Sequence, residues 1–294
     1  MTTALADARR GHRGLFAFAV AMAALTPVLA ILVLVDDRVL LGAPLWLKPL
    51  KFAVSLALYS ATLSWMLGQL RERALSRTGW IITVAGGVEM AIIVGQAAVG
   101  NRSHYNMDTP LSAALWGTMG VTITVLWLAT LAVAVRFLRV PGRDRAAGTA
   151  IRLGVVVALI GLGEGFLMAS TGAHAVGVPD GGPGLPLVGW STTGGDLRVA
   201  HFIGMHALQG LPLLAFALAA TRLGEDTRVR LVRIAAAAWT GLVVLLTWQA
   251  LRAQPLLAPD AVTLAALATL VAVTAAATVG TLAPARRTTA PTTV

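Results

Sequence analysis

Eight separate blocks of predominantly apolar residues, each close to twenty residues long, dominate the chain. They cover residues 14–35, 50–70, 80–100, 112–135, 152–171, 198–220, 231–251 and 261–282. A helix needs about 20 such residues to cross about 30 Å of hydrocarbon, because lipid offers no partner for a free backbone N–H or C=O group. The blocks therefore predict an all-α bundle of eight transmembrane helices, forming one integral membrane domain over residues 1–294.

The composition excludes an ordinary soluble enzyme. Charged residues make up 12% of the chain and the mean hydropathy is +0.78, whereas soluble proteins average about 25% charged residues. The chain contains no cysteine, which removes disulfides, thiolate metal sites, iron–sulfur clusters and cysteine nucleophiles. Any metal or cofactor must therefore rest on His, Glu, Asp, Met, Gln or backbone groups.

The basic residues between the apolar blocks are unequally divided between the two sides of the membrane. With the N-terminus in the cytoplasm, 17 of the 23 basic residues fall inside: Arg9, Arg10, Arg13, Arg71, Arg73, Arg77, Arg136, Arg139, Arg143, Arg145, Arg152, Arg222, Arg228, Arg230, Arg233, Arg286 and Arg287. This asymmetry follows the positive-inside rule and predicts a bacterial inner-membrane protein with both termini cytoplasmic. The net charge of +10 then points to anionic lipids of the inner leaflet as partners, and not to nucleic acid.

Three segments outside the central blocks carry their own predictions. The first apolar run continues to Val35, too long for a cleaved signal peptide, so we interpret it as an anchor. The polar, Thr-rich tail, residues 283–294, is typical of a disordered cytoplasmic segment. The loop at residues 172–197 is dense in Gly and Pro but also contains Val, Leu and Trp. This apolar content favours a plug or lid that covers the outer helix ends, and the alternative is a flexible linker.

Two regions of the chain show a similar polar pattern. Gln96 precedes Asp108, and Gln249 precedes Asp260, in each case with a basic residue between them and the Asp before a new apolar block. This pattern is compatible with two parallel four-helix halves, residues 1–145 and 146–294, and also with chance similarity.

Ionisable residues inside apolar blocks are functional candidates, because each costs several kcal/mol in hydrocarbon unless it is paired or hydrated. Glu89 lies roughly 16 Å from the outer end of its helix, close to the bilayer centre, and Glu164 lies about 12 Å from the outer end of another. We expect Glu89 to act as a protonatable group and Glu164 as a ligand or as the orienting partner of one.

The densest polar signal is the segment HFIGMHALQGLP in the sixth block. On one continuous helix, His201, Met205, His206, Gln209 and Pro212 occupy a single arc that must face the bundle interior. Neutral imidazole with a carboxylate suits iron, zinc or copper(II). The alternative is that these side chains serve only as hydrogen bonds between helices.

The second block carries a polar stripe. Lys48, Lys51, Ser55, Tyr59, Thr62, Met66 and Gln69 recur at spacings of 3, 4, 4, 3, 4 and 3. Two lysines at a helix N-terminus oppose the helix dipole, which predicts an anion or a carboxylate between them. In the alternative, the lysines only extend to the outer headgroups.

These residues together predict one outward-facing pocket beneath the loop at 172–197. We assign catalytic roles to Glu164, His206 and Glu89, and metal ligation to His201, His206 and Glu164. The predicted cofactor contacts are His201, His206, His104 and Gln209, and the predicted substrate contacts are Lys48, Lys51, Tyr59, Gln96 and Arg102.

Five strings carry a family resemblance: APLWLKPLKF, SHYNMDTP, GAHAVGVPDGGPGLPLVGWSTTGGDLR, AHFIGMHALQGLPL and TWQALRAQPLLAPD. They resemble a family of bacterial polytopic inner-membrane proteins, and the resemblance implies no activity. The eight spans and the His-bearing second helix of a half also resemble haem A synthase, in which two helices of each half carry paired histidines. Here the second, fourth and eighth blocks contain no histidine, so bis-histidine ligation would need His201 or His206 with a loop residue such as His104.

The leading functional prediction is a His/Glu-lined site in the outer half of the bundle. It would bind haem, a divalent metal or a small redox-active or lipidic ligand, as in a membrane oxidoreductase. The first alternative is a proton-coupled transporter of small molecules that uses Glu89. The second is a membrane assembly factor without catalysis.

Overall fold

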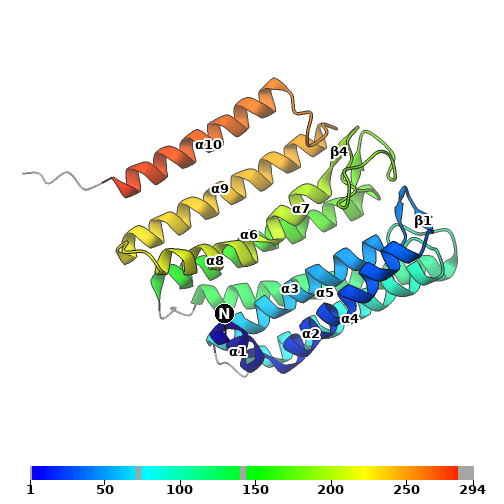
Figure 1. Ribbon diagram of the computed structural model, residues 1–294, viewed down its shortest axis with the longest axis horizontal. Helices are drawn as coiled ribbons and strands as arrows, with labels where there is room; N and C mark the ends of the chain where they lie inside the picture. The colour runs from blue at the N-terminus through cyan, green and yellow to red at the C-terminus, as the bar shows by residue number, and fades with distance from the viewer. Residues whose placement is uncertain (1, 71–73, 140–143, 284–294) are drawn as a thin grey trace, which may run out of the picture.

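The computed structural model describes residues 2–70, 74–139 and 144–283, and Figure 1 shows their arrangement. In chain order the elements are α1 (Thr2–Gly11), α2 (Arg13–Val35), β1 (Val39–Leu40), β2 (Ala43–Pro44), α3 (Leu47–Leu70), α4 (Ala74–Ala98), α5 (Pro110–Arg139), α6 (Arg145–Thr171), β3 (Ala175–Val176), β4 (Gly195–Asp196), α7 (Leu197–Met205), α8 (Ala207–Ala219), α9 (Glu225–Leu251) and α10 (Ala261–Leu282). Strands β1 and β2 form one antiparallel hairpin, and β3 and β4 pair antiparallel in another.

The predicted all-α, multi-pass architecture is confirmed. Within the described residues, α2, α3, α4, α5, α6, α9 and α10 are each long and apolar enough to cross a membrane. Helices α7 and α8 meet the same test only as a pair, and they are bent by 41° where they join. Each of the eight apolar blocks thus corresponds to one span or, in the sixth block, to one broken span.

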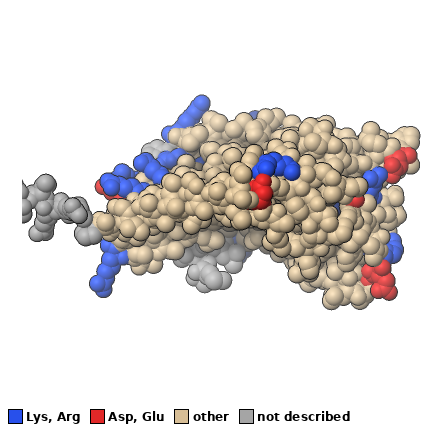
Figure 2. All heavy atoms as spheres, turned by 90° about the horizontal axis from the view of Figure 1, so that it is seen from above, with Lys and Arg blue, Asp and Glu red and all other residues tan. Residues whose placement is uncertain are grey.

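The two ends of the bundle differ in charge. The N-terminus and the end of α10 lie together at one end, and both hairpins lie at the other (Figure 1). Lys and Arg side chains project from the end with the termini, whereas the visible Asp and Glu lie mainly toward the opposite one (Figure 2). We call these the arginine-rich end and the hairpin end. Arg71, Arg73, Arg143, Arg286 and Arg287, with nearly all of the predicted tail, lie outside the described residues.

Several helices extend beyond their apolar blocks at the arginine-rich end. Helices α4, α6 and α9 begin at Ala74, Arg145 and Glu225, earlier than hydropathy alone predicts. Arg, Glu and Ala are good helix formers, and long basic side chains can reach the headgroups while their backbone stays helical. An apolar window marks where the hydrocarbon ends, and the helix continues past that point.

The prediction of one continuous sixth helix is wrong. The chain bends at His206, which lies between α7 and α8 and makes no side-chain cap for α8. Pro212 in α8 has no N–H to bond the preceding turn. Gly161 of α6 also packs so closely that a Cβ on it would fall 2.4 Å from the Met205 nitrogen. Residues on the two sides of the bend therefore do not share the single arc that was predicted for His201 through Pro212.

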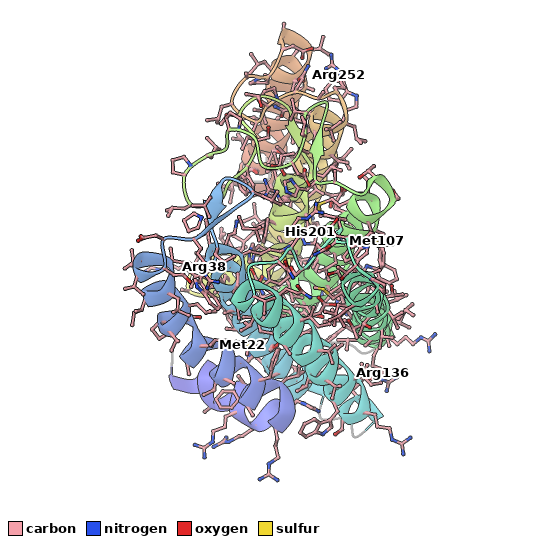
Figure 3. All side chains as sticks on the ribbon, turned by 90° about the vertical axis from the view of Figure 1, so that its right-hand side faces the viewer. Met22, Arg38, Met107, Arg136, His201 and Arg252 are labelled. Carbon is pink, nitrogen blue, oxygen red and sulfur yellow. The ribbon has the colours of Figure 1, made fainter. Side chains whose placement is uncertain are left out.

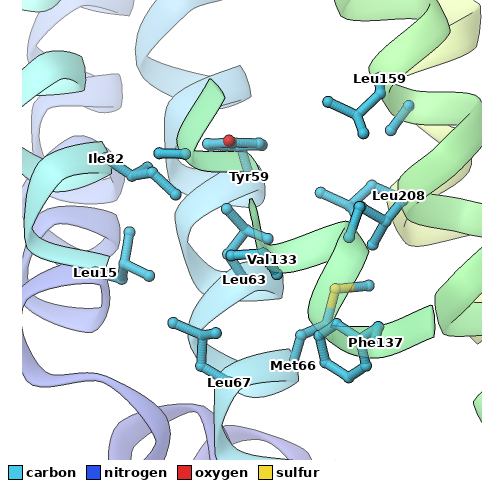
Figure 4. Packing of buried hydrophobic residues seen from close by; sticks show 14 of the residues in the cluster. Leu15, Tyr59, Leu63, Met66, Leu67, Ile82, Val133, Phe137, Leu159 and Leu208 are labelled. Atoms are coloured by element: carbon cyan, nitrogen blue, oxygen red, sulfur yellow. The ribbon is translucent and has the colours of Figure 1, made fainter. Parts of the chain in front are cut away.

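The main apolar core lies where the two predicted halves of the chain meet. It joins α2, α3, α4 and α5 to α6 and α8, and it includes Leu63, Met66, Val133, Val155 and Leu208, all at most 3% exposed (Figure 4). Packing of α3 on α8 and of α5 on α6 crosses the same boundary. This core holds the bundle together away from its charged ends.

Several features of the first half recur in the second. Helix α2 packs on α3 and α4, and α4 packs on α5, while α6 packs on α7, α8 and α9, and α9 packs on α10. A β-hairpin follows the first helix of each half. Helices α4 and α9 also end in matching hydrogen bonds: Gly100 N–H to Ala97 C=O with Asn101 N–H to Gln96 C=O, and Ala253 N–H to Ala250 C=O with Gln254 N–H to Gln249 C=O. Both are Schellman ends with a left-handed residue, Gly100 or Ala253. They favour the predicted division at residue 145.

His12, near the arginine-rich end, links three helices. Its Nδ1 accepts a hydrogen bond from Leu15 N–H at the start of α2, and its Nε2 lies 2.9 Å from the Ser76 carbonyl oxygen of α4. Its backbone N–H donates to Ser64 Oγ of α3. Because Nδ1 must accept, the proton lies on Nε2, and one neutral tautomer satisfies both ring nitrogens.

We expect His12→Ala to lower the thermal midpoint of the detergent-solubilised protein. The substitution removes a helix N-cap and an interhelical hydrogen bond, together worth about 2 kcal/mol. Thr26→Ala is the matched control, because the Thr26 hydroxyl bonds only the Met22 carbonyl of its own helix. Equal midpoints for the two variants would contradict the linking role of His12.

Candidate functional site

Each arginine at the hairpin end is paired with an aspartate close to it in sequence. The pairs are Arg38–Asp36 (2.7 Å), Arg102–Asp108 (3.2 Å), Arg198–Asp196 (2.6 Å) and Arg252–Asp260 (2.6 Å). Hydrogen bonds from Arg38 hold the pKa of Asp36 well below its usual range, and Arg252 does the same for Asp260. These arginines are therefore largely neutralised.

The two lysines at this end differ from the arginines. Lys48 and Lys51 lie in the first turn of α3, and neither forms an ion pair with a described acidic residue. The Lys51 ammonium donates to the Val188 carbonyl oxygen at 3.0 Å. Lys48 makes no hydrogen bond within the described residues. It lies within electrostatic range of Arg198 and Lys51 and also of the acidic Glu89 and Asp180, and Lys51 lies within range of Asp196. The lysines are thus the basic residues of the hairpin end that have no described carboxylate in direct contact.

The loop between α6 and α7 is a folded structure over the ends of the helices. Strands β3 and β4 close its base, and a further bridge joins Gly184 to Ser191. Asp196 is 3% exposed, caps α7, and accepts hydrogen bonds from Ser191 N–H and from the Arg198 backbone and side chain. Gly181 lies against Gly42 of the other hairpin. The loop thus folds against the ends of the helices at the hairpin end, and its place on the outer side of the membrane stays a prediction.

His174 and Asp180 lie inside this loop, within electrostatic range of the lysine pair. Asp180 accepts backbone hydrogen bonds from His174 and Ala175, and its Oδ1 lies 3.2 Å from His174 Nδ1. Burial and the charges of Arg198 and Lys48 together lower the pKa of His174 to about 4, against the opposing effects of Asp180 and Asp196. The ring is therefore neutral at pH 7.

His104 lies in an aromatic cluster beside Lys48. Its ring centroid lies 5.7 Å from that of Phe52, 5.3 Å from Trp116 and 6.1 Å from Tyr105. Burial, with a smaller contribution from Lys48, holds the pKa of His104 well below its usual range. Burial also raises the pKa of Tyr105 to about 12. Both side chains are therefore neutral hydrogen-bonding groups next to a cation.

The predicted His/Glu group is engaged by separate neighbours. Thr122 donates to Glu89 at 2.7 Å, and Thr247 donates to Glu164 at 2.8 Å. The second oxygen of Glu164 has no hydrogen-bond partner among the described residues. His201 Nδ1 lies 2.7 Å from the Gly161 carbonyl oxygen, near the middle of the bundle seen from the hairpin end (Figure 3).

The remaining histidine of the broken span makes a polar bridge to α3. His206 Nδ1 lies 3.3 Å from Gln209 Oε1, and Gln209 donates to Thr62 at 3.2 Å. Within residues 2–70, 74–139 and 144–283, no three or more His, Asp and Glu side chains are grouped to hold a metal ion.

In the described part of the chain, three residues that were predicted to contact a substrate form no hydrogen bond or ion pair with the two lysines: Tyr59, Gln96 and Arg102. Tyr59 is buried in the main core, where its hydroxyl bonds Thr130. Gln96 is 7% exposed, and its side-chain oxygen has no hydrogen-bond partner among the described residues. Arg102 pairs with Asp108. Of the predicted residues, the structure brings Lys48, Lys51 and His104 into one cluster.

Arg198 and Asp180 belong to this cluster and were not among the predicted site residues. The signal for Arg198 was present, because Arg198 and His201 begin α7 at the same spacing as Lys48 and Lys51 begin α3. Asp180 gave no such signal, because its position depends on how the loop folds. We call Lys48, Lys51, Arg198, His104, His174 and Asp180 the hairpin-end cluster.

No protein family, curated protein or solved structure matches the chain.

Lowering the pH from about 6.5 to about 4 should destabilise the hairpin end. The folded protein keeps His104 and His174 neutral because their pKa values are lowered, whereas the unfolded chain binds protons below about 6.5. The unfolded state then binds more protons, so stability falls as the pH falls. Asp36 and Asp260 add to this loss from about pH 5 downward, because their carboxyl groups bind protons near pH 3.8 in the unfolded chain and only at lower pH in the folded protein.

The measurement is the thermal midpoint of the solubilised protein between pH 7.5 and 4. His174→Gln should flatten the profile, since one of the two uncharged rings is gone. A profile as steep as that of the wild type in this variant would show that His174 is not the group responsible.

Proposed function

We propose that this multi-pass membrane protein binds a small anionic ligand, bearing a carboxylate or phosphate group, at its hairpin end. The observation that carries the proposal is the contrast between the basic residues at that end. Every arginine there has an aspartate partner, and neither lysine does. A partly buried ammonium with no carboxylate in direct contact is unfavourable unless an anion completes the site.

The backbone adds to this positive potential. Helices α3 and α7 both begin at the hairpin-end cluster, and each helix N-terminus carries about half a positive charge. At α7 the first two N–H groups already bond the His174 carbonyl group and Asp196, so the backbone contribution comes from the start of α3. Lys48 and Arg198, one from each helix, lie within electrostatic range of each other. An anion placed at the start of α3 would interact with both side chains and with the α3 dipole.

The neutral side chains of the cluster suit selection among anions. His104 and His174 supply hydrogen-bonding nitrogens without adding charge, and Tyr105 supplies a hydroxyl. Lys51 already holds the loop through Val188, so a ligand that binds this ammonium also acts on the loop. Under the positive-inside rule we expect the arginine-rich end to face the cytoplasm, and the ligand site would then face the extracytoplasmic side.

Lys48→Gln should weaken anion binding by about tenfold or more, since a charge-assisted hydrogen bond contributes about 1.5–3 kcal/mol. Calorimetric titration of the solubilised protein with phosphate, pyrophosphate, acetate and citrate measures this effect. Arg252→Gln is the matched control, because it removes one positive charge from the same end at a residue paired with Asp260.

Two results would contradict the proposal. One is the absence of saturable binding for every anion in the series. The other is an equal loss of affinity in Lys48→Gln and Arg252→Gln, which would mean that only the overall charge of the hairpin end matters.

The broken span favours transport of the anion as a second candidate function. Transporters commonly bind substrate at helices that are interrupted within the membrane. Helices α7 and α8 bend by 41° at His206, and the bend packs on α6 through Gly161 and Gly204. The Gln209–Thr62 bond ties α8 to α3, the helix that begins with Lys48. A movement of α8 would therefore displace α3, the helix that carries Lys48 and Lys51.

Glu89 offers a means of coupling such transport to protons. Its carboxyl group lies within electrostatic range of Lys48. A bound anion and an ionised Glu89 would repel each other beside the same lysine, so the anion binds better once Glu89 carries a proton. Anion and proton would then enter together.

For a proton-coupled carrier, Glu89→Gln should abolish uptake driven by a pH gradient in proteoliposomes while anion binding persists. Glu164→Gln is the matched control, because that carboxyl group contacts Thr247 of α9. Uptake is followed with a radiolabelled anion and an internal pH dye. Gradient-driven uptake by Glu89→Gln at the wild-type rate would rule out this role.

Haem or a divalent metal at the His/Glu group is the other prediction from the sequence. Because no three of the described His, Asp and Glu side chains are grouped to hold a metal ion, the residues present do not fit a divalent metal held by three or more side chains, and we derive no step through one. Haem needs only one or two axial ligands, so this grouping does not bear on it. An absorption spectrum and metal analysis of the purified protein test this alternative directly.

A further inference from the structure

A groove of about 370 Å³ runs along the outside of the bundle between α4 and α5. Its lining residues are Trp80, Ile81, Val84, Ala85, Val88, Val121, Thr122 and Val125. Val84 and Val121 are 63% and 65% exposed, so the groove opens toward the surrounding lipid. It lies apart from the hairpin-end cluster.

The interior of the groove suits hydrocarbon and not a polar ligand. Thr122 is its one polar residue besides the indole of Trp80, and the Thr122 hydroxyl already bonds Glu89 and the Thr118 and Met119 carbonyl groups. The deep end therefore presents no free hydrogen-bonding group. A chain lying there would also cover the Glu89–Thr122 pair from the lipid side.

The groove together with Arg77 covers about one leaflet. Arg77 lies two helical turns before Val84 on the same face of α4, and it is exposed. The α4 lining of the groove runs from Trp80 to Val88, a rise of about 12 Å, and the rise from Arg77 to Val88 is about 16 Å, close to half of the hydrocarbon thickness of about 30 Å. A lipid with its phosphate at Arg77 and one acyl chain in the groove would thus reach from the headgroup layer to about the bilayer centre.

Charge at the mouth of the groove selects the headgroup. Besides Arg77, Arg136 lies three turns from Val125 on the same face of α5. Trp80, 52% exposed, stands between the arginine and the apolar lining, at the depth that tryptophan favours in membranes. We propose that this groove is a specific site for an anionic phospholipid, with one acyl chain along α4 and α5 and its phosphate at Arg77.

The test measures lipid retained by the full-length protein in detergent, using native mass spectrometry with phosphatidylglycerol and phosphatidylcholine of the same chains. We expect selective retention of phosphatidylglycerol by the wild type, about fivefold weaker retention in Arg77→Gln, and loss of the selectivity in Val84→Trp, which fills the groove. Val273→Trp is the matched control, because Val273 is 62% exposed on α10, away from the groove.

Several outcomes would overturn the proposal. They are equal retention of the two lipids by the wild type, unchanged selectivity in Val84→Trp, and loss of selectivity in the Val273→Trp control. Competition by free glycerol phosphate would overturn the acyl-chain part, because a headgroup alone would then suffice. Should Val84→Trp fail to fold, Val121→Trp blocks the same groove from the facing helix.

Discussion

Lipid supplies neither a proton acceptor nor a counter-charge, so each polar group of this bundle must find its partner within the protein. Many do so on a neighbouring helix or within their own loop. Thr122 bonds Glu89, Thr247 bonds Glu164, and the Gly161 carbonyl bonds His201. The arginines at the hairpin end pair with aspartates a few residues away. Against this background the lysines at the start of α3 stand out, because a charge left without a partner is costly wherever water is scarce.

The repeated features of the two halves explain why positive charge gathers where it does. If the halves arose by duplication, α3 and α7 are equivalent helices, and each begins with a basic residue followed three positions later by a second nitrogen-bearing side chain. Packing the halves together through the core around Leu63 and Leu208 then brings both helix N-termini to one place. In the second half, Asp196 forms an ion pair with Arg198 at the start of α7. In the other no equivalent aspartate contacts Lys48 among the described residues, so the two halves are no longer equivalent electrostatically.

Hydropathy was sufficient to predict the fold class and the spans, because the requirement for apolar length in lipid is strict. The bend at His206 was missed because a helical wheel assumes unbroken hydrogen bonding. The segment HFIGMHALQGLP also carries no signal that Gly161 of another helix packs closely against its backbone. His12 precedes the first apolar block, yet it is 6% exposed, because two of its hydrogen-bond partners come from residues more than fifty positions away. In the candidate site, Lys48 and Lys51 were recognisable from their conflict with the helix dipole. The other members depend on loop folding, which periodicity does not encode.

Glu89 lies between Lys48 of the proposed anion site and the lipid-facing groove. On one side it lies within electrostatic range of Lys48. On the other side, it accepts a hydrogen bond from Thr122, which lines the lipid-facing groove. A proton on Glu89 and an anion beside Lys48 stabilise each other, whereas water entering from the lipid side would solvate the carboxylate and weaken that coupling. An acyl chain in the groove keeps the carboxyl group dry. The lipid would thus act on anion binding through the dielectric around Glu89, without touching the ligand.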